Sequence, residues 1–392
     1  MSPATRCHIL IFEPRVAGHH LTWLRYISQD FLAKGYRLTL AIDGRPQTAS
    51  RYDRLLAELQ ATVQIVSIYD DRGKLYGGSK TAALAAALAR SGADHVFINN
   101  FDDVASNMFR RASMGSYPPA ILRGRMSGVY FRPRFLPNPF WPPGNFIKRI
   151  GFQRLVKKGW FLHLFLMDEY LCQEHAHRYP AAGMHFLPDP WSGDFSTETL
   201  SARQQLNIAC DRFVFLHYGL GARRKGLHLA VEAMNRHPEA KWHLLCAGKL
   251  KTDRNLMHRL KLLENSGNAT VLDRYVSDNE QQLCFCASDV VLLPYINHFG
   301  SSGVLSLAAA AGKIVIASDN GLLGRRVRDH KLGICFSSGN STALSNAMAQ
   351  VETMSSEQKQ CLAANAISYA GQCDRNAFRR ALHSMSLSPK NQ

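Results

Sequence analysis

Several common sequence features are absent from this chain of 392 residues, and each absence excludes a class of protein. None of the nine cysteines forms a C-x-x-C pair, so their spacing does not indicate a zinc site. An odd number of scattered cysteines suits free thiols in a reducing compartment. No uncharged apolar run of about 18 residues occurs, which argues against a membrane-spanning helix. The first residues, MSPATRCHILIFEP, lack the basic and long apolar regions of a signal peptide, so we expect a cytoplasmic protein.

Acidic residues are also scarce. The chain has 47 Lys and Arg against 30 Asp and Glu, which gives a formal net charge of +17. Such a charge predicts an anionic partner, whether nucleic acid, a phosphate-bearing small molecule or an anionic membrane surface. The imbalance is strongest between Val104 and Met167, where there is no Asp or Glu and there are eleven Lys and Arg.

Aromatic residues crowd the same acid-free stretch, namely Tyr130, Phe131, Phe135, Phe140, Trp141, Phe146, Phe152 and Trp160. A basic segment rich in aromatics, at about 123–167, is typical of a surface that rests on anionic lipid, so we expect a peripheral protein on the inner face of the cell membrane. Single-stranded nucleic acid is an alternative partner, but no nucleic-acid motif accompanies the segment. A third interpretation is a helix whose apolar stripe, Phe152, Leu155 and Val156, belongs to the core while its basic face is solvated.

What the sequence does contain is an alternation of strand and helix patterns. The first is CHILIF, a glycine turn, a helix that begins at about Gly18 and the strand RLTLAI. Further strands are predicted at 62–68, 95–100 and 120–124, the last reading AILRG. A linker with two prolines, GMHFLPDPWSGDF, then precedes a second series of strands and helices.

These patterns predict two Rossmann-like α/β domains that face each other across a cleft. We place the first at 1–188 and the second at 189–370, with a tail at 371–392 that packs back on the first domain. Because ligands of such sheets bind at the carboxyl ends of the strands, we expect the active site in the cleft.

The stretch FVFLHYGLGARRKG, residues 213–226, carries a glycine-rich loop. Its G-x-G start suggests a dinucleotide-binding loop, but Arg224 stands where the third glycine belongs and the next strand ends in CAGK without a carboxylate. Two glycines followed by Arg223, Arg224 and Lys225 before a helix favour a diphosphate site instead. A solvated turn with ordinary surface cations is the remaining alternative.

A second loop supports the diphosphate interpretation. In HFGSSGVLSLAAAAG, a polar glycine loop follows a buried strand, and a helix of small residues begins near Ser302 or Gly303. Its first backbone N–H groups form a second natural anion site. Two such loops in one domain suit a nucleotide diphosphate better than either does alone.

These stretches resemble the GT-B glycosyltransferases of the large retaining family 4, also called group 1. The family's ordered motifs correspond to YGLGARRKG, LLCAGK, ASDVVLLPY, HFGSSGVLSLAAAAGKIVIAS and NGLLG in this chain, over about residues 210–345. The resemblance implies transfer of a sugar from a nucleotide-diphosphate-sugar donor to a glycan or lipid-linked acceptor, with retention, in cell-envelope or extracellular polysaccharide synthesis. It implies no cofactor, no obligatory metal and no nucleic-acid partner.

The resemblance also implies site residues, position by position. Lys225, Arg224 and His19 correspond to catalytic positions, and His20 and Arg125 to the acceptor side. The donor-binding positions are Gly18, Gly219, Arg223, Tyr275, Asn297, His298, Gly300, Ser301, Ser302, Gly303 and Val304.

The sequence departs from the family pattern at several positions. Leu220 replaces the arginine after the first glycine, and the family's two glutamates fall at Asn297 and Leu307. The usual histidine after a strand of the first domain is Arg125. A non-catalytic GT-B homologue that binds carbohydrate or membrane, and a nucleotide-sugar epimerase, are therefore alternative interpretations.

Overall fold

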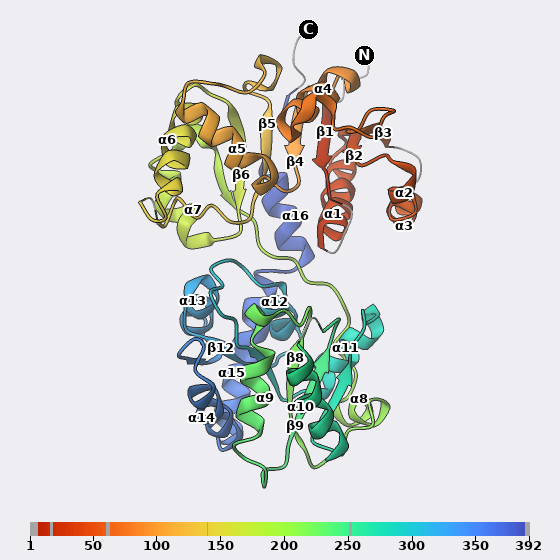
Figure 1. The fold of residues 1–392 in the computed structure, drawn as a ribbon, viewed down its shortest axis with the longest axis vertical. Coiled ribbons are helices and arrows are strands. Elements are labelled where there is room, and N and C mark those ends of the chain that lie inside the picture. The colour runs from red at the N-terminus through yellow and green to blue at the C-terminus, as the bar shows by residue number, and fades with distance from the viewer. Residues whose placement is uncertain (1–6, 16–18, 60–62, 139, 251–252, 389–392) are drawn as a thin grey trace. The chain divides into compact units, whose positions relative to one another are not determined.

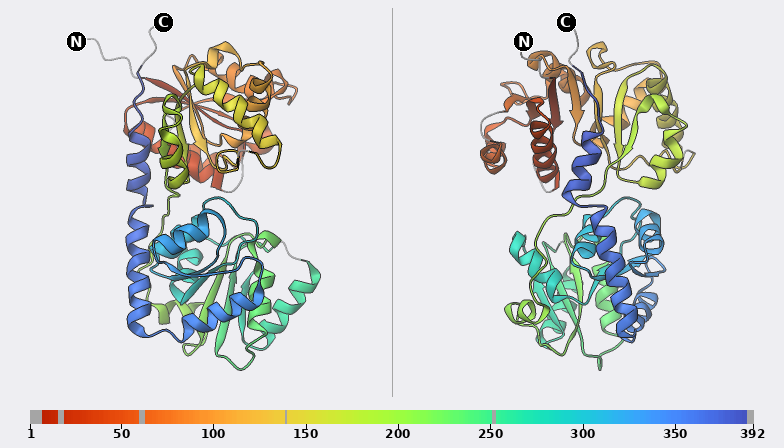
Figure 2. Two further views of the ribbon diagram at one scale, coloured as in Figure 1. Left: turned by 90° about the vertical axis from the view of Figure 1, so that its left-hand side faces the viewer. Right: turned by 180° about the vertical axis from the view of Figure 1, so that it is seen from behind.

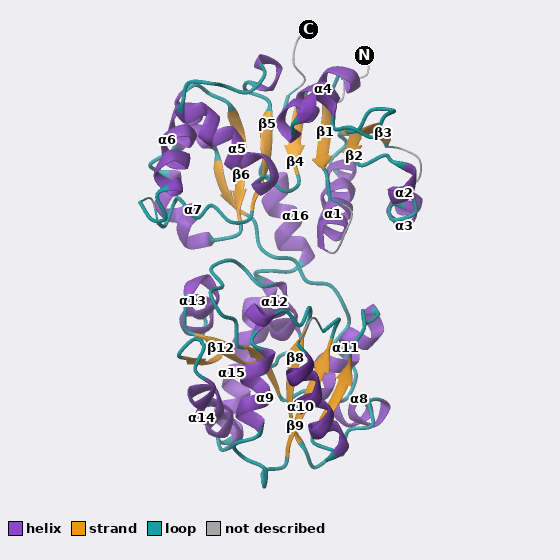
Figure 3. Cartoon of the chain, viewed as in Figure 1, coloured by secondary structure: helices purple, strands orange, loops and turns teal. Residues whose placement is uncertain are grey.

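The computed structural model describes residues 7–15, 19–59, 63–138, 140–250 and 253–388. The chain forms two compact units (Figure 1): Met1–Leu187 together with Arg379–Gln392, and Pro188–Phe378. The boundary after Leu187 therefore falls inside the predicted linker with two prolines. Each unit is a parallel sheet with helices on both faces (Figure 3), as the strand and helix patterns predicted.

The N-terminal unit has a seven-stranded sheet in the order β3-β2-β1-β4-β5-β6-β7, and every pair is parallel. Its strands are β1 (His8–Glu13), β2 (Arg37–Ile42), β3 (Gln64–Ser67), β4 (His95–Ile98), β5 (Met126–Tyr130), β6 (Phe161–Leu166) and β7 (Met184–Phe186). Its helices are α1 (His19–Ala33), α2 (Pro46–Ala49), α3 (Asp53–Glu58), α4 (Lys80–Ser91), α5 (Asp102–Ser113), α6 (Gly144–Lys157) and α7 (Glu169–Ala176).

The strand predicted at 120–124 is wrong. Ala120–Leu122 forms a 3₁₀ turn, and the strand β5 begins at Met126. The sequence of β5, MSGVY, gives a weak strand signal because Ser127 and Gly128 have low strand propensity. The structure requires the glycine, since a Cβ on Gly128 would lie 2.4 Å from the carbonyl oxygen of Ile98 on β4. The close approach of β4 and β5 requires this glycine, and the glycine weakens the sequence pattern by which β5 could have been recognised.

The two faces of the N-terminal sheet are covered by different helices. Helices α4, α5 and α6 pack on one face in a core that includes Leu10, Phe12 and Ile98. On the other face, Phe31 of α1 lies edge-to-face on Phe97 of β4, with ring centroids 5.1 Å apart.

The end of the chain joins this second face. Helix α16 (Arg375–His383) is blue in Figure 2, and its residues from Arg379 onward belong to the N-terminal unit. There, Arg379 Nε donates to the buried Asp30 carboxylate at 3.0 Å. Lys34 Nζ donates to the carbonyl oxygens of His383 and Met385 at 2.6 and 2.7 Å. These contacts attach Arg379–His383 to α1.

The C-terminal unit has a six-stranded sheet in the order β10-β9-β8-β11-β12-β13. Its strands are β8 (Phe213–Tyr218), β9 (Trp242–Ala247), β10 (Ala269–Leu272), β11 (Val290–Leu293), β12 (Ile314–Ser318) and β13 (Gly333–Phe336). Its helices are α8 (Thr199–Gln205), α9 (Leu227–Met234), α10 (Arg254–Asn265), α11 (Asp278–Ala287), α12 (Gly303–Ala310), α13 (Gly321–Asp329), α14 (Ser341–Glu352) and α15 (Ser356–Gly371).

Alternate residues of the C-terminal strands face opposite sides of the sheet, and both sides are buried. Val291 and Leu293 of β11 belong to a core with α11, α12 and α15, whereas Val290 and Leu292 belong to a core with α9, α10 and α14. Because both faces are covered, the strands read as continuous apolar runs. This explains why they were recognisable in the sequence.

The two sheets share one topology. In each sheet, the first strand lies between the second and the fourth. The chain therefore builds the sheet to one side of the first strand, and the fourth strand begins the other side. Loops at the carboxyl ends of these two central strands diverge at this switch point and leave room for a ligand. The switch points lie between β1 and β4 in the N-terminal unit and between β8 and β11 in the C-terminal unit.

Candidate active site

The glycine-rich loop lies at the carboxyl end of β8. The loop includes a 3₁₀ turn, Arg223–Lys225, and ends at Gly226, which has φ of +72° and precedes α9. A Cβ on Gly226 would lie 1.9 Å from the carbonyl oxygen of Pro294, so only glycine allows the two loops of the switch point to meet here. The side chain of the buried His217 also holds the turn, because its Nε2–H donates to the carbonyl of Lys225 at 3.1 Å.

The second loop follows β11 and leads into α12. Its Asn297 has φ of +51°, a left-handed conformation that asparagine adopts more readily than most residues. This backbone requirement accounts for an asparagine at this exposed position. His298 Nε2 donates to the carbonyl of Ser301 at 3.1 Å, so Nδ1 of the neutral ring is an acceptor.

The two loops contact each other directly. The N–H of Ile296 donates to the carbonyl of Arg224 at 2.8 Å, and Lys225 Nζ lies 3.7 Å from the centroid of the Tyr295 ring. Burial, with the Lys225 charge adding to it, lowers the pKa of His298 to about 4. At neutral pH the site therefore contains the cations of Arg224 and Lys225 beside an uncharged imidazole.

Helix α12 begins at this meeting point. Ser302 is its N-cap residue, but the Ser302 side chain makes no capping bond, and its hydroxyl lies 3.3 Å from the Tyr295 hydroxyl. The N–H groups of Gly303 and Val304 are in the first turn, where no carbonyl of the preceding turn can accept from them. The predicted residues Ser302, Gly303 and Val304 thus lie next to the loop that carries Lys225.

A carboxylate that the sequence analysis missed lies at the same place. Asp189 Oδ2 accepts from the Ser301 hydroxyl at 3.2 Å, and Ser301 Oγ also accepts from Arg326 Nη1 at 2.7 Å. A Cβ on Gly303 would lie 3.6 Å from both Asp189 carboxylate oxygens. Burial raises the pKa of Asp189 to about 6, although the Arg326 cation, the Ser301 bond and the Lys225 cation all oppose the rise. The signal in the sequence was an acid between two prolines, LPDP, directly at the linker.

Arg223 and Tyr275 have different surroundings from Lys225. Arg223 lines a cavity of about 50 Å³ with Gly221, His228 and Asp253, between the glycine loop and the start of α10. Tyr275 follows β10 and is 83% exposed. Gly219, at the end of β8, and Gly300, two residues before the cap of α12, belong to the two loops themselves. The three consecutive cations are therefore not equivalent, because Arg223 lies on a different side of the turn.

A carboxylate, an imidazole and an amide lie at the N-terminal switch point, in place of the cations of the C-terminal one. Gly18 lies outside the described residues, and His19 begins α1. The buried His20 Nδ1 lies 3.2 Å from Oε2 of Glu13, the last residue of β1. Asn99, directly after β4, donates from Nδ2 to the same oxygen at 2.6 Å, and its own Oδ1 is buried without a hydrogen-bond partner. The sequence analysis missed Glu13 and Asn99. An acid and an amide at the carboxyl ends of β1 and β4 were the signal that could have found them.

Arg125 does not reach this switch point. It precedes β5, and its carbonyl accepts from the N–H of Val96 at the amino end of β4. The assignment to the acceptor side followed from the strand that was placed too early. With β5 at its true position, the cation beyond its carboxyl end is Arg132, whose Nε lies 3.7 Å from Asp102.

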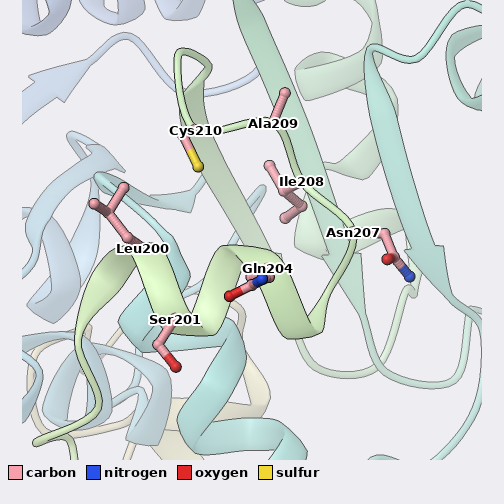
Figure 4. Close-up of a pocket in the computed structure, with 7 residues that line it drawn as sticks. All are labelled: Leu200, Ser201, Gln204, Asn207, Ile208, Ala209 and Cys210. Atoms are coloured by element: carbon pink, nitrogen blue, oxygen red, sulfur yellow. The ribbon is translucent and has the colours of Figure 1, made fainter.

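A shallow hollow of about 710 Å³ lies elsewhere on the C-terminal unit (Figure 4). Its lining comes from α8 and from the segment that leads into β8, and includes Leu200, Gln204 and Cys210. These residues lie at the amino end of β8, whereas the glycine loop follows its carboxyl end. No cationic side chain lines the hollow, so it does not suit a diphosphate.

The C-terminal unit can be compared with known families. Residues 199–368 match the family described as glycosyl transferases group 1. The match covers most of the C-terminal unit. The match contains both loops of the group 1 domain and Arg326, but Asp189 precedes it. No curated protein sequence matches the chain.

Solved structures resemble the whole chain. A sucrose-phosphate synthase from Thermosynechococcus elongatus is 16% identical with a TM-score of 0.68, covering 97% of this chain and 98% of its own. Anabaena HepE in complex with UDP and glucose is 16% identical with a TM-score of 0.67, covering 97% and 99%. A glycosyltransferase from Rickettsia africae is 13% identical with a TM-score of 0.67, covering 96% of both chains.

These likenesses establish the predicted GT-B fold. The match of residues 199–368 to the group 1 glycosyl transferases, in a chain of this fold, supports a glycosyltransferase that uses a nucleotide-sugar donor. The resemblance drawn from the sequence motifs is confirmed. Within the described residues, no helix is both long and apolar enough to cross a membrane.

Proposed function

We propose that this glycosyltransferase moves a hexosyl group from a nucleotide-diphosphate-sugar donor to a glycan or lipid-linked acceptor, with retention at the anomeric carbon. We place the reaction in cell-envelope or extracellular polysaccharide synthesis at the cytoplasmic face of the membrane. One observation carries the proposal. The loops after β8 and β11 bring Arg224, Lys225 and the first N–H groups of α12 together at the switch point.

This arrangement suits the leaving group of the reaction. A diphosphate gains charge as its bond to the sugar breaks, and preformed cations and helix N–H groups stabilise that charge most in a part-buried site. Anabaena HepE, a structural relative, was solved with UDP and with UDP-glucose. This supports a nucleotide sugar as donor for a chain of the same fold.

The proposed step needs no carboxylate nucleophile. The bond between the anomeric carbon and the diphosphate oxygen breaks, and the acceptor oxygen bonds to the same carbon from the same face. The acceptor's proton passes to the departing diphosphate, which is held by Arg224 and Lys225. We propose that the neutral His298 accepts a hydrogen bond from a sugar hydroxyl at Nδ1, in place of the glutamate that the family has nearby.

The first experiment is a thermal-shift screen of the full chain against nucleoside diphosphates and nucleotide sugars. A ligand at a hundred times its Kd stabilises a protein by roughly 2.7 kcal/mol, so a true donor raises the melting temperature clearly. Lys225→Ala is expected to abolish this shift. The control, Lys241→Ala, removes an exposed lysine paired with Asp211 in the same unit and should leave the shift intact.

Turnover with the best donor then tests the chemistry. Anomeric configuration of the product, read by NMR, distinguishes retention from inversion. Transfer in the presence of a chelator tests the expected independence from metal. Absence of stabilisation by every nucleotide in the panel would contradict the proposed site.

A further inference from the structure

The structure separates the aromatic residues of the acid-free stretch into two groups. Tyr130, Phe135, Phe152 and Trp160 are buried in the core of the N-terminal unit. By contrast, Phe140 is 67% exposed and Trp141 is 76% exposed. Phe146 and Ile147, in the first turn of α6, are 47% and 44% exposed. The apolar stripe of α6 is thus core, and the exposed apolar side chains gather around its beginning.

We call Phe140, Trp141, Phe146 and Ile147 the aromatic patch. Two of its members contact each other, because the rings of Phe140 and Phe146 stack with centroids 6.1 Å apart. Single exposed apolar residues are ordinary on protein surfaces, but four large ones within eight residues form a patch that indicates a binding surface.

The patch stands on an ordered support. Asn145 is buried, and its Nδ2 donates to the carbonyls of Asn138 and Trp141 at 2.9 and 3.0 Å. The N–H of Asn145 donates to the carbonyl of Pro142 at 2.7 Å. One side chain therefore fixes the loop that presents the aromatic residues, so their exposure belongs to the folded state.

Cations surround the aromatic patch. The guanidinium of Arg149 lies 5.6 Å from the Phe140 ring, and Arg110 Nη2 lies near Gly144 at the start of α6. Burial, and then the charges of Arg110 and Arg134, lower the pKa of Lys148, which shows that these cations converge. We call Arg110, Arg134, Lys148 and Arg149 the basic rim. Asp102, whose charge acts on Lys148, also accepts from the Phe131 N–H and lies 3.7 Å from Arg132.

We propose that the aromatic patch and its basic rim dock this protein on an anionic lipid bilayer. Aromatic side chains enter the boundary between headgroups and acyl chains, while cations outside them meet the lipid phosphates. A second copy of the chain fits less well, because a two-fold contact would place one basic rim against another. Nucleic acid fits less well too, since base stacking has no use for Ile147 and Phe140 already stacks on Phe146.

Vesicle flotation of the full chain tests the docking. The protein is expected to float with vesicles of phosphatidylcholine and phosphatidylglycerol, and not with phosphatidylcholine alone, and salt should weaken the binding. Failure to bind the anionic vesicles at low salt would overturn the proposal.

Trp141 supplies a direct readout of insertion. Trp23, Trp160 and Trp242 are buried, and the half-buried Trp191 lies in the C-terminal unit, where its Nε1 donates to the carbonyl of Ala370. The part of a vesicle-induced blue shift that is lost in Trp141→Phe therefore reports on Trp141. Trp141→Phe should keep most of the binding and lose most of the blue shift. Binding without any blue shift of the parent protein would contradict insertion.

Two matched sets of variants locate the surface. Replacing Phe140, Trp141, Phe146 and Ile147 by serine is expected to abolish flotation, whereas the equally exposed Leu200, Leu262 and Ile367 replaced by serine should not. Lys148→Gln with Arg149→Gln should weaken binding roughly 25-fold, at about fivefold for each charge. Lys157→Gln with Lys158→Gln, on the exposed far end of the same helix region, is the control.

Each variant is checked for its melting temperature and for the nucleotide-induced thermal shift, which reads the C-terminal unit independently of lipid. If the serine variant changes the sedimentation of the protein alone, or its retention of single-stranded oligonucleotide, more than its vesicle binding, the patch serves self-association or nucleic acid instead.

Discussion

The two units of this protein carry the same sheet topology and opposite chemistry at their switch points. Between β8 and β11 the loops contribute Arg224, Lys225 and the N-terminus of α12. Between β1 and β4 they contribute a buried carboxylate, Glu13, with His20 and Asn99 bonded to it. Topology therefore decides where a ligand can bind, whereas the few residues after each strand decide which ligand is bound.

The difference suggests a division of labour that experiments can break. We propose that the cations bind the donor diphosphate and that the Glu13–His20 pair positions a hydroxyl group of the acceptor, because an imidazole oriented by a carboxylate can hydrogen-bond to that hydroxyl. Variants in the C-terminal switch point should then change donor affinity. Variants in the N-terminal switch point should change turnover at unchanged donor affinity.

Lys225→Ala is expected to have the largest effect. The lysine lies over Tyr295 at the point where the two loops meet, so its removal takes away one of the two cations that hold the leaving diphosphate. We expect kcat/KM to fall by roughly 10²–10³, which is the scale for one electrostatic group at a developing charge. A normal rate for Lys225→Ala, measured beside Lys241→Ala, would show that the donor phosphates bind elsewhere.

Glu13→Gln is expected to come next. The substitution keeps the shape of the side chain and removes the charge that faces His20 and Asn99. Turnover should fall by roughly 10²-fold, on the scale of a misplaced reacting group, with donor affinity unchanged. Glu58→Gln, which removes the partner of the half-buried Arg25, is the control in the same unit. If Glu13→Gln weakens donor binding as much as Lys225→Ala does, the division between the two switch points is wrong.

Asp189→Asn tests how an anion shares the cationic switch point with the donor. Burial raises the pKa of Asp189 to about 6, so the carboxyl is neutral below pH 6 and negative above it. Its charge beside α12 repels a diphosphate, and donor affinity should therefore fall a few-fold, on the scale of about 1 kcal/mol, as the pH rises through about 6. His298, with a pKa of about 4, does not change charge in this range.

The ligand for this titration is a nucleotide sugar. A terminal phosphate has a second pKa of about 6 and would titrate in the same range, whereas the diester of a nucleotide sugar has no such step. Asp189→Asn should remove the pH dependence and bind as tightly at pH 8 as the parent does at pH 5. Weaker binding by Asp189→Asn at every pH would show instead that the carboxylate holds the donor directly.

Arg223→Ala is expected to have the smallest effect. Arg223 lines the small cavity with His228 and Asp253, whereas Lys225 lies over Tyr295. Donor affinity and turnover should therefore change less than about twofold, within the range of ordinary exposed charges. A loss as large as that of Lys225→Ala would show that all three cations act together, contrary to the geometry of the turn.

The sequence predicted the C-terminal unit better than the N-terminal unit. Every predicted strand from β8 to β12 and the helices between them occur, because both faces of that sheet are buried and the strands are continuous apolar runs. In the N-terminal unit, β5 contains Ser127 and Gly128 and was placed too early. Arg125 was assigned to the carboxyl end of this predicted strand. Because the strand was placed too early, Arg125 was placed at the wrong end of the sheet.

The sequence by itself determined the two glycine loops, their cations and the helix starts beside them. These depend on local chemistry: which residue tolerates positive φ, where a helix leaves its N–H groups unpaired and which side chains are always charged. The two site groups that it did not determine join residues far apart in the chain. Asp189 meets Ser301, 112 residues away, and Glu13 meets Asn99, 86 residues away. Strand order and packing create such contacts, so the tertiary structure alone decided them. For the same reason, it alone separated the core aromatics of the basic segment from those on its surface.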